Sequence, residues 1–429
     1  MTAKTDTLPV RLAYGRSYLT VQLPAGRTEV MEPLFQPGLR DEKTSMEQAL
    51  ASPIGARPLV EWLKPGSRIC IVFNDITRAT PNERIIPWIL EALARAGVKE
   101  SQITLLNATG THRGNTPAEL ETMLTKAVVD RYRVVNHDCH DNASLAAAGK
   151  MRSGRPALLN RNLVEADVRI ITGFIEPHFF AGFSGGVKGI MPGVGGLDSI
   201  VANHGAKNIG DSRATFGVTE GNPLWEELRD IALSIGDSFL VNVSLNESRA
   251  ITGIFAGDMI EAHRAGINFV RASAMRKVDK PFPIVITTNS GYPLDLNLYQ
   301  GVKGMRAAAQ IIEPGGLIIL AAECSEGLPS KSPHEELLFS ATTAEELLGR
   351  ICSEGFSWPE QWAAHIQTLI QKRAEVLLYS SIPDQIVRRS HLAPCHDIAQ
   401  AVNERLATLG PDARVAALPQ GPLTLPYLA

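Results

Sequence analysis

One stretch of the sequence combines two reactive side chains with many glycines. In EPHFFAGFSGGVKGIMPG, residues 176–193, His178 and Lys188 lie in a segment too rich in glycine for a regular helix or strand. A nucleotide-binding P-loop requires glycine directly before the lysine and a hydroxyl residue after it, whereas Lys188 lies between Val187 and Gly189. Backbone N–H groups in such a loop can still cradle a phosphate. An isolated lysine with a neutral amine is also accessible for covalent attachment.

Polar side chains follow several short apolar runs that are typical of buried parallel strands, SRICIVF (67–73) among them. The residues that follow these runs are Asp75, Thr77 and Arg78, then His112 and Arg113, then His178 and Lys188, and later Tyr299, Gln300 and Lys303. In open α/β sheets, ligands bind beyond the carboxyl ends of the strands. We therefore expect an active-site cleft between two α/β domains, although a loop histidine or an Asp75–Arg78 ion pair would also be ordinary surface structure.

The elements that position these residues repeat a strand, loop and helix pattern. After the strand at 67–73, Thr80, Pro81 and Glu83 predict a capped helix start, and Thr116, Pro117 and Glu119 repeat this chemistry after the strand at 102–108. Further strands are expected at 167–174, 283–289 and 316–323. These units predict doubly wound, mainly parallel sheets.

The predicted domains are an N-terminal α/β domain at 1–277, carrying the glycine-rich loop, and a C-terminal α/β domain at 278–429. The boundary follows a helical stretch at 258–277. The last ~30 residues include ARVAALPQGPLTLP, which could add an edge strand to either domain.

Composition excludes several classes of protein. The 429 residues are 44% hydrophobic and 20% charged with a net charge of −3, which gives no reason to expect a nucleic-acid partner. No apolar run approaches the roughly 20 residues of a membrane-spanning helix, and the start lacks a signal-peptide layout. Five scattered cysteines without CxxC spacing suit free thiols in a reducing compartment. We expect a cytoplasmic enzyme or binding protein.

Two places in the sequence could bind metal. NHDCHDN (136–142) has metal-ligating residue types, but consecutive side chains diverge rather than converge on one ion. His204, in VANHGAKN, follows the glycine-rich loop after a short helix-like link. It could turn back toward Lys188 as a single imidazole ligand.

Taken together, the chain resembles the nickel-pincer lactate racemase family over nearly its whole length. The resemblance is carried, in this order, by FNDITRATP, NATGTHRGNTPAE, PHFFAGFSGGVKGIMPG, NHG and YPLDLNLYQGVKGMRAA. Members of this family have two α/β domains and racemise or epimerise 2-hydroxy acids. They use a nickel-bearing pincer cofactor derived from a nicotinic acid nucleotide.

The resemblance implies roles for individual residues. Lys188 would hold the cofactor, a pyridinium-3-thioamide-5-thiocarboxylic acid mononucleotide with nickel, through a thioamide bond, and His204 would complete the nickel coordination. His112 and His178 would be the two acid/bases on opposite faces of the substrate. The residues expected to bind the cofactor are Asp75, Thr77, Gly185 and Gly186, and those expected to bind substrate are Arg78, Tyr299, Gln300 and Lys303.

The resemblance also implies accessory enzymes that build the cofactor. The substrate is lactate or a related 2-hydroxy acid, and the sequence leaves open which one. It also leaves open the choice between racemase and epimerase and the oligomeric state. Trp358 and Trp362 are candidates for the wall of the substrate pocket, or ordinary packing residues. Two alternatives remain. One is a zinc-dependent hydrolase using His112, His178 and His204, which would leave Lys188 unexplained. The other is a non-catalytic protein that binds a nucleotide cofactor, which would not need paired histidines.

Overall fold

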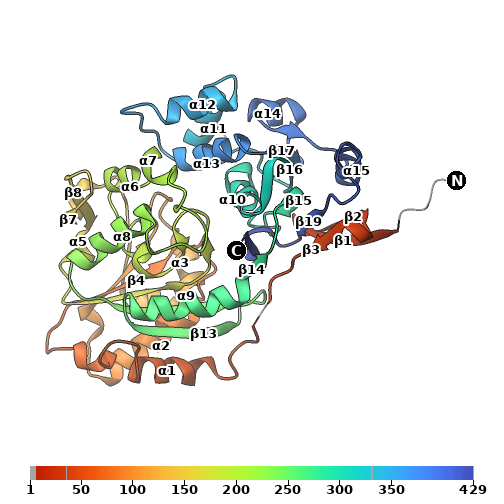
Figure 1. The fold of residues 1–429 in the computed structure, drawn as a ribbon. Coiled ribbons are helices and arrows are strands. Elements are labelled where there is room, and N and C mark those ends of the chain that lie inside the picture. The colour runs from red at the N-terminus through yellow and green to blue at the C-terminus, as the bar shows by residue number, and fades with distance from the viewer. Residues whose placement is uncertain (1–5, 35, 330–331, 429) are drawn as a thin grey trace. The chain divides into compact units, whose positions relative to one another are not determined.

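The computed structural model describes residues 6–34, 36–329 and 332–428. The chain forms two compact units (Figure 1). The N-terminal unit comprises Phe35–His204 and Gly217–Ser273. The C-terminal unit comprises the chain up to Leu34, Gly205–Phe216, and the chain from Ala274 onward. The predicted division between residues 277 and 278 lies close to the last of these junctions, but the sequence did not indicate that two earlier segments belong to the C-terminal unit.

The N-terminal unit is built on a six-stranded sheet in the order β13-β12-β9-β4-β5-β6. Its strands are β4 (Ile69–Asn74), β5 (Ile103–Ala108), β6 (Arg133–Asn136), β9 (Val168–Phe174), β12 (Phe239–Leu245) and β13 (Ile251–Asp258). All neighbouring pairs are parallel except β12 and β13. The predicted mainly parallel sheet is confirmed, and the predicted strands at 67–73, 102–108 and 167–174 coincide with β4, β5 and β9 to within about two residues.

α-Helices, short 3-10 helices (labelled η) and short hairpins complete this unit. They are α1 (Glu42–Ala51), η2 (Leu59–Trp62), α2 (Asn82–Arg95), η3 (Glu100–Gln102), α3 (Pro117–Leu124), α4 (Lys126–Arg131), η4 (Asn142–Ser144), β7 (Leu145–Lys150), β8 (Pro156–Asn160), α5 (Arg161–Val164), β10 (Pro177–His178), β11 (Gly182–Phe183), η5 (Gly186–Gly189), α6 (Leu197–Asn203), α8 (Pro223–Ser234) and α9 (Glu261–Ala274). One face of the sheet, through residues such as Ile71, Phe73 and Val241, forms a hydrophobic core with α1–α4. The other face carries η5, where Gly189 lies against Ile171 of β9. On β13, α9 packs with the rings of Phe255 and Phe269 5.6 Å apart.

The two predicted helix caps have different outcomes. Thr116 accepts a hydrogen bond from the N–H of Glu119, whose carboxylate binds the N–H of Thr116, so the capping box is confirmed. The Thr80 cap is wrong, because α2 begins at Asn82 and the Thr80 hydroxyl donates instead to Oδ1 of Asn74 at 2.7 Å. Asn74, the last residue of β4, thus binds the hydroxyl that was expected to cap the helix.

The C-terminal unit has a second six-stranded sheet, in the order β18-β17-β16-β15-β19-β3, in which every pair is parallel. Its strands are β3 (Thr28–Val30), β15 (Phe282–Thr288), β16 (Ile312–Ala321), β17 (Glu375–Tyr379), β18 (Ala393–Pro394) and β19 (Val415–Leu418). The predicted strands at 283–289 and 316–323 correspond to β15 and β16. The expectation that the last residues form an edge strand is wrong for β19, because β3 pairs with it on the outer side.

The remaining elements of this unit surround its sheet. They are β1 (Thr7–Tyr14), β2 (Ser17–Pro24), η1 (Ala25–Arg27), α7 (Ala206–Ile209), β14 (Met275–Val278), α10 (Leu298–Ala308), α11 (Pro333–Phe339), α12 (Ala344–Ile351), α13 (Gln361–Gln371), α14 (Asp384–Arg389), α15 (Ile398–Thr408), η6 (Gly421–Leu423) and β20 (Leu425–Leu428). The β1–β2 hairpin and α15 share a core with one face of the sheet. The strand β14, predicted as the end of a long helix, pairs with β20. Among the residues that the structure describes, no helix is both long and apolar enough to cross a membrane.

Candidate active site

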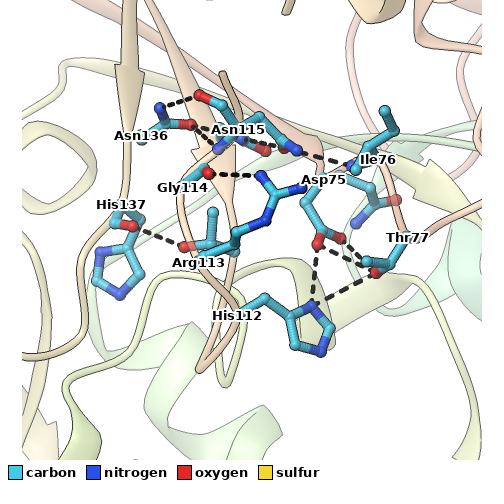
Figure 2. A network of polar contacts seen from close by, with 12 residues as sticks. Asp75, Ile76, Thr77, His112, Arg113, Gly114, Asn115, Asn136 and His137 are labelled. Carbon is cyan, nitrogen blue, oxygen red and sulfur yellow. Dashed lines mark hydrogen bonds and ion pairs between the residues drawn. The ribbon is translucent and has the colours of Figure 1, made fainter. Parts of the chain in front are cut away.

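His112 lies in the loop after β5, and residues from the loop after β4 hold its imidazole. Its Nδ1 is 2.9 Å from Oδ2 of Asp75 and 3.4 Å from Oγ1 of Thr77 (Figure 2). The Thr77 hydroxyl also donates to the Asp75 carboxylate at 3.0 Å. Because an ionised carboxylate can only accept, Nδ1 of His112 carries the hydrogen and Nε2 carries the lone pair. Nε2 is therefore a proton acceptor whose protonated form the carboxylate would stabilise.

The environment of Asp75 keeps this carboxylate ionised. Its side chain is 4% exposed, whereas that of His112 is 37% exposed. Burial opposes ionisation, but the hydrogen bond and charge of His112, together with the charge of Arg78, hold the pKa of Asp75 below its ordinary value. The partner of Asp75 is thus His112, and the Asp75–Arg78 ion pair left open by the sequence does not form within 4 Å.

Buried amides tie the loops after β4 and β5 together. Nδ2 of Asn107, in β5, donates to Oδ1 of Asn115 at 2.8 Å and to Oδ1 of Asn136 at 2.7 Å. The Asn115 oxygen also accepts the backbone N–H of Ile76 at 3.3 Å (Figure 2). The loop of His112 and the loop of Asp75 are therefore fixed to each other, which keeps the histidine beside its carboxylate.

The glycine-rich stretch forms a very short hairpin, β10 with β11, followed by one turn of 3-10 helix, η5, which carries Lys188. His178 pairs with Gly182 in this hairpin. Nδ1 of His178 accepts the backbone N–H of Ala181 at 3.3 Å and lies 3.5 Å from the N–H of Phe180. Because Nδ1 accepts, the hydrogen of neutral His178 is on Nε2. This is the opposite tautomer to that of His112.

Three of the predicted site residues lie around the ring of Phe180. The ring centroid of His178 is 4.5 Å away and that of His204 is 5.1 Å away, both edge to face. Nζ of Lys188 lies 5.5 Å from the same centroid. We call Phe180, His178, Lys188 and His204 the Phe180 cluster. The sequence predicted the three polar members but gave Phe180 no role, although it lies inside the stretch that suggested them.

His204 is suited to bind a metal ion as a neutral ligand. It follows α6 directly, and Nδ1 lies 3.1 Å from the carbonyl oxygen of Ile200. A carbonyl only accepts, so Nδ1 carries the hydrogen and the lone pair is on Nε2. Burial first, and then the charge of Lys188, lower the pKa of His204 to about 3, although the Ile200 bond opposes this. The imidazole is therefore neutral at physiological pH, as a metal ligand must be.

The alternative metal sites find no support in the side-chain arrangement. Within the described ranges, no three His, Cys, Asp or Glu side chains are grouped as a metal ion would require, so His112, His178 and His204 do not form a zinc site. In NHDCHDN, Nε2 of the buried His137 lies 2.9 Å from the carbonyl oxygen of Gly195, and Nδ1 lies 3.1 Å from Nδ2 of Asn160. Both ring nitrogens of His137 thus serve packing between loops. All five cysteines are free, and only Cys352 is exposed.

The remaining predicted residues lie in the C-terminal unit, at the start of α10. Asn297 caps this helix by accepting the N–H of Gln300 at 3.2 Å. Tyr299 and Lys303 are four residues apart and therefore project from the same helix face. The Tyr299 hydroxyl accepts a hydrogen bond from Nε1 of Trp362 at 3.0 Å. Trp362 is thus fixed beside a predicted substrate-binding residue, whereas Nε1 of Trp358 donates to the carbonyl of Pro333.

Sequence comparison identifies both parts of the chain. Residues 14–217 match the lactate racemase N-terminal domain family, and residues 278–424 match the lactate racemase C-terminal domain family. The lactate racemase of Thermoanaerobacterium thermosaccharolyticum is 32% identical over 418 residues, covering 96% of this chain and 97% of that protein. The lactate racemase of Lactiplantibacillus plantarum is 33% identical over 419 residues, covering 96% and 98%.

Structure comparison agrees. The lactate racemase apoprotein from T. thermosaccharolyticum superposes with a TM-score of 0.91 at 32% identity, covering 98% of this chain and 100% of that one. A Thermotoga maritima protein of known structure shares the fold, with a TM-score of 0.67 at 19% identity over 90% of this chain and 98% of that one. The family matches and the near full-length relatives lead to one conclusion: this chain belongs to the lactate racemase family.

Proposed function

We propose that this protein interconverts the two configurations at C2 of lactate or a related 2-hydroxy acid, using a nickel-pincer nucleotide attached to Lys188. Membership of the lactate racemase family makes it an isomerase. The observation that carries the proposal is the Phe180 cluster, because it places a primary amine and a neutral imidazole against one aromatic ring. These are the two groups that the cofactor requires from the protein.

The residues present fit this cofactor. The lone pair on Nε2 of His204 suits nickel, for which imidazole is a preferred ligand. The amine of Lys188 is near enough to His204 for its charge to lower the pKa of the imidazole, and attachment through the amine would remove that charge. When bound, the cofactor would supply an acceptor for the C2 hydrogen, which leaves with its electron pair as hydride.

The two histidines would handle the hydroxyl proton. Removing hydride from C2 leaves a carbonyl only if the hydroxyl proton also leaves, so a base must lie within hydrogen-bond reach. Nε2 of His112 has the lone pair for this step, and Asp75 would stabilise the resulting imidazolium. The planar 2-oxo acid can regain its hydride on either face. His178 would return a proton from Nε2 to the oxygen on the other face as an imidazolium, which it forms by taking a proton from solvent, while His112 releases its proton to solvent.

Binding of the substrate carboxylate is assigned to cationic side chains. Arg78 is exposed in the N-terminal unit, and its guanidinium is suited to bidentate contact with a carboxylate. Lys303 of the C-terminal unit would act as a point charge, with Tyr299 and Gln300 as further substrate contacts. Asp75 and Thr77, proposed to contact the cofactor, also orient His112.

Intact-mass measurement, combined with metal analysis, separates this function from its rivals. Protein produced together with the cofactor-building enzymes should gain the mass of a lysine-bound nucleotide and contain nickel. A zinc hydrolase would contain metal without the mass gain. A cofactor carrier would show the mass gain but would not interconvert any 2-hydroxy acid.

A further inference from the structure

We propose that Asn242 and His263 are positioning residues that fix the backbone immediately before Lys188 and so hold its amine ready for cofactor attachment. The inference rests on the proposed function for the role of Lys188. The two residues come from different elements, the strand β12 and the helix α9. Both are buried, with 0% and 1% of their surface exposed.

Gly185 and Gly186 are required by contact with these two side chains. Both have positive φ angles, 74° and 54°, which only glycine adopts readily. A Cβ on Gly185 would stand 2.3 Å from Oδ1 of Asn242, and a Cβ on Gly186 would stand 2.4 Å from Nδ1 of His263. The space that a side chain would need is therefore filled by the protein itself. This explains the paired glycines without reference to the approach of a cofactor.

Hydrogen bonds fix the same backbone from two sides. The N–H of Gly186 donates to Oδ1 of Asn242 at 2.7 Å. Nε2 of His263 lies 2.8 Å from the carbonyl oxygen of Ser184 and donates to it. Burial lowers the pKa of His263 to about 4, so the ring is neutral, and the carbonyl fixes its hydrogen on Nε2. Asn242 thus accepts a backbone N–H and His263 donates to a backbone carbonyl, both within residues 184–186.

This frame is continuous with the turn that carries the lysine. η5 begins at Gly186, and the N–H of Lys188 donates to the carbonyl of Gly185 at 3.1 Å. Loss of the Asn242 acceptor would leave the N–H of Gly186 buried without a partner, which favours conformations that expose it. Displacement of Gly185 and Gly186 would move the first turn of η5, and the amine of Lys188 with it.

The first test measures amide hydrogen exchange in the protein made without cofactor-building enzymes. Asn242→Leu removes the acceptor but keeps the branched outline of the side chain, and His263→Phe keeps a ring but removes the donor. Each should speed exchange in the peptide spanning residues 184–189 by about tenfold, the usual consequence of losing one buried hydrogen bond. Unchanged exchange in both variants would overturn the proposal.

Conservative variants and a control separate positioning from general damage. Asn242→Asp retains an acceptor, and His263→Gln retains a donor at the position of Nε2, so both should exchange at close to the wild-type rate. The control is Ser244→Ala. Ser244 lies in β12, two residues after Asn242, and the change removes its buried hydrogen bond to Thr252 of β13. It should not affect residues 184–189. Should Asn242→Leu fail to fold, His263→Phe on α9 tests the frame independently.

The second test measures the fraction of chains that gain the cofactor mass after production with the cofactor-building enzymes. Asn242→Leu and His263→Phe should reduce this fraction at least about fivefold, with Asn242→Asp and His263→Gln restoring it. If exchange rises but attachment is as complete as in wild type, Asn242 and His263 do not position Lys188 for attachment. If wild type itself gains no mass, the proposed function is wrong, and the exchange data still decide whether Asn242 and His263 fix the loop.

Discussion

His112 and His178 lie in two regions of the N-terminal unit that hold an imidazole by different means. In one region, an ionised carboxylate binds Nδ1 of His112, and more than a third of the histidine side chain is exposed. In the other, backbone N–H groups face Nδ1 of His178, and its ring packs on the buried Phe180. In the first, the carboxylate on Nδ1 stabilises an imidazolium, whereas in the second, Nδ1 is a hydrogen-bond acceptor for the backbone.

The surroundings of His112 and of His204 also differ in how they treat charge. Charge is tolerated beside Asp75, where solvent and a carboxylate offset it. Around Phe180 the neighbouring His204 is kept neutral, which preserves the lone pair that a metal requires. A carboxylate beside His204 would favour its protonated form, so surroundings like those of His112 would not suit the ligand role proposed for His204.

The largest effect is expected from Lys188→Ala. This change removes the only amine of the Phe180 cluster, so the covalent mass gain should disappear completely, and racemase activity with it. The measurement is intact mass after production with the cofactor-building enzymes. Lys150→Ala, on the exposed surface of β7, is the control and should gain mass normally. A full mass gain in Lys188→Ala would remove the covalent assignment.

Next in size are His112→Ala and His178→Ala. Each should retain nickel, because neither residue is assigned as a ligand, and each should lose interconversion by about 10²–10⁴-fold, the usual value of one acid or base. Nickel content and kcat on the loaded protein check this. His140→Ala, in the exposed part of NHDCHDN, should behave as wild type. Wild-type rates in either of the first two variants would exclude that histidine from catalysis.

A smaller effect is expected from Asp75→Asn, which tests what the carboxylate adds to His112. We expect kcat to fall by about 10–100-fold, because the amide does not stabilise imidazolium.

The contribution of Asp75 to the free energy of unfolding should also depend on pH. The pKa of Asp75 is lowered by folding, so its contribution is complete above about pH 4, its ordinary value, and is lost as the pH falls below that.

The free energy of unfolding of wild type and Asp75→Asn, measured by urea titration between pH 3 and 7, checks this sign. The difference should be constant at the upper end and shrink toward pH 3. A difference that grew as the pH fell would contradict an ionised Asp75.

The smallest effect is expected from Thr77→Val. The change keeps the shape of the side chain but removes hydrogen bonds of 3.0 Å to Asp75 and 3.4 Å to His112. Because His112 keeps its direct bond to Asp75, kcat should fall less than tenfold, and the mass gain should be at least partly retained. A loss as large as that in Asp75→Asn would mean that Thr77, and not the carboxylate, orients the histidine.

The sequence predicted those parts of the structure that depend on local pattern. Buried apolar runs identified β4, β5, β9, β15 and β16, and Thr116 with Glu119 identified the start of α3. Long-range partners were not visible. Thr80 resembles Thr116 in sequence, yet Asn74 binds it. The strands β1–β3 at the start of the chain belong to the C-terminal unit, because β3 pairs with β19 almost 400 residues away.

The same limit applied to the site. Residue types and spacing, together with the family resemblance, identified His112, His178, Lys188 and His204, but not which ring nitrogen of each histidine carries its hydrogen, since that depends on the partners of Nδ1. Asn242 could have been noticed in the sequence, because it is a polar residue in the middle of an apolar strand, FLVNVSL. Its partner, the N–H of Gly186, lies 56 residues earlier and could be found only in the structure.

The most direct test of the proposed function is a chiral assay of 2-hydroxy acids, lactate first, with protein shown by mass and metal analysis to carry the cofactor and nickel. The account predicts that at least one acid is interconverted in both directions until the two configurations reach equilibrium, and that the Lys188→Ala protein does nothing. Loaded protein that interconverts none of a panel of small, large and acidic 2-hydroxy acids would contradict it.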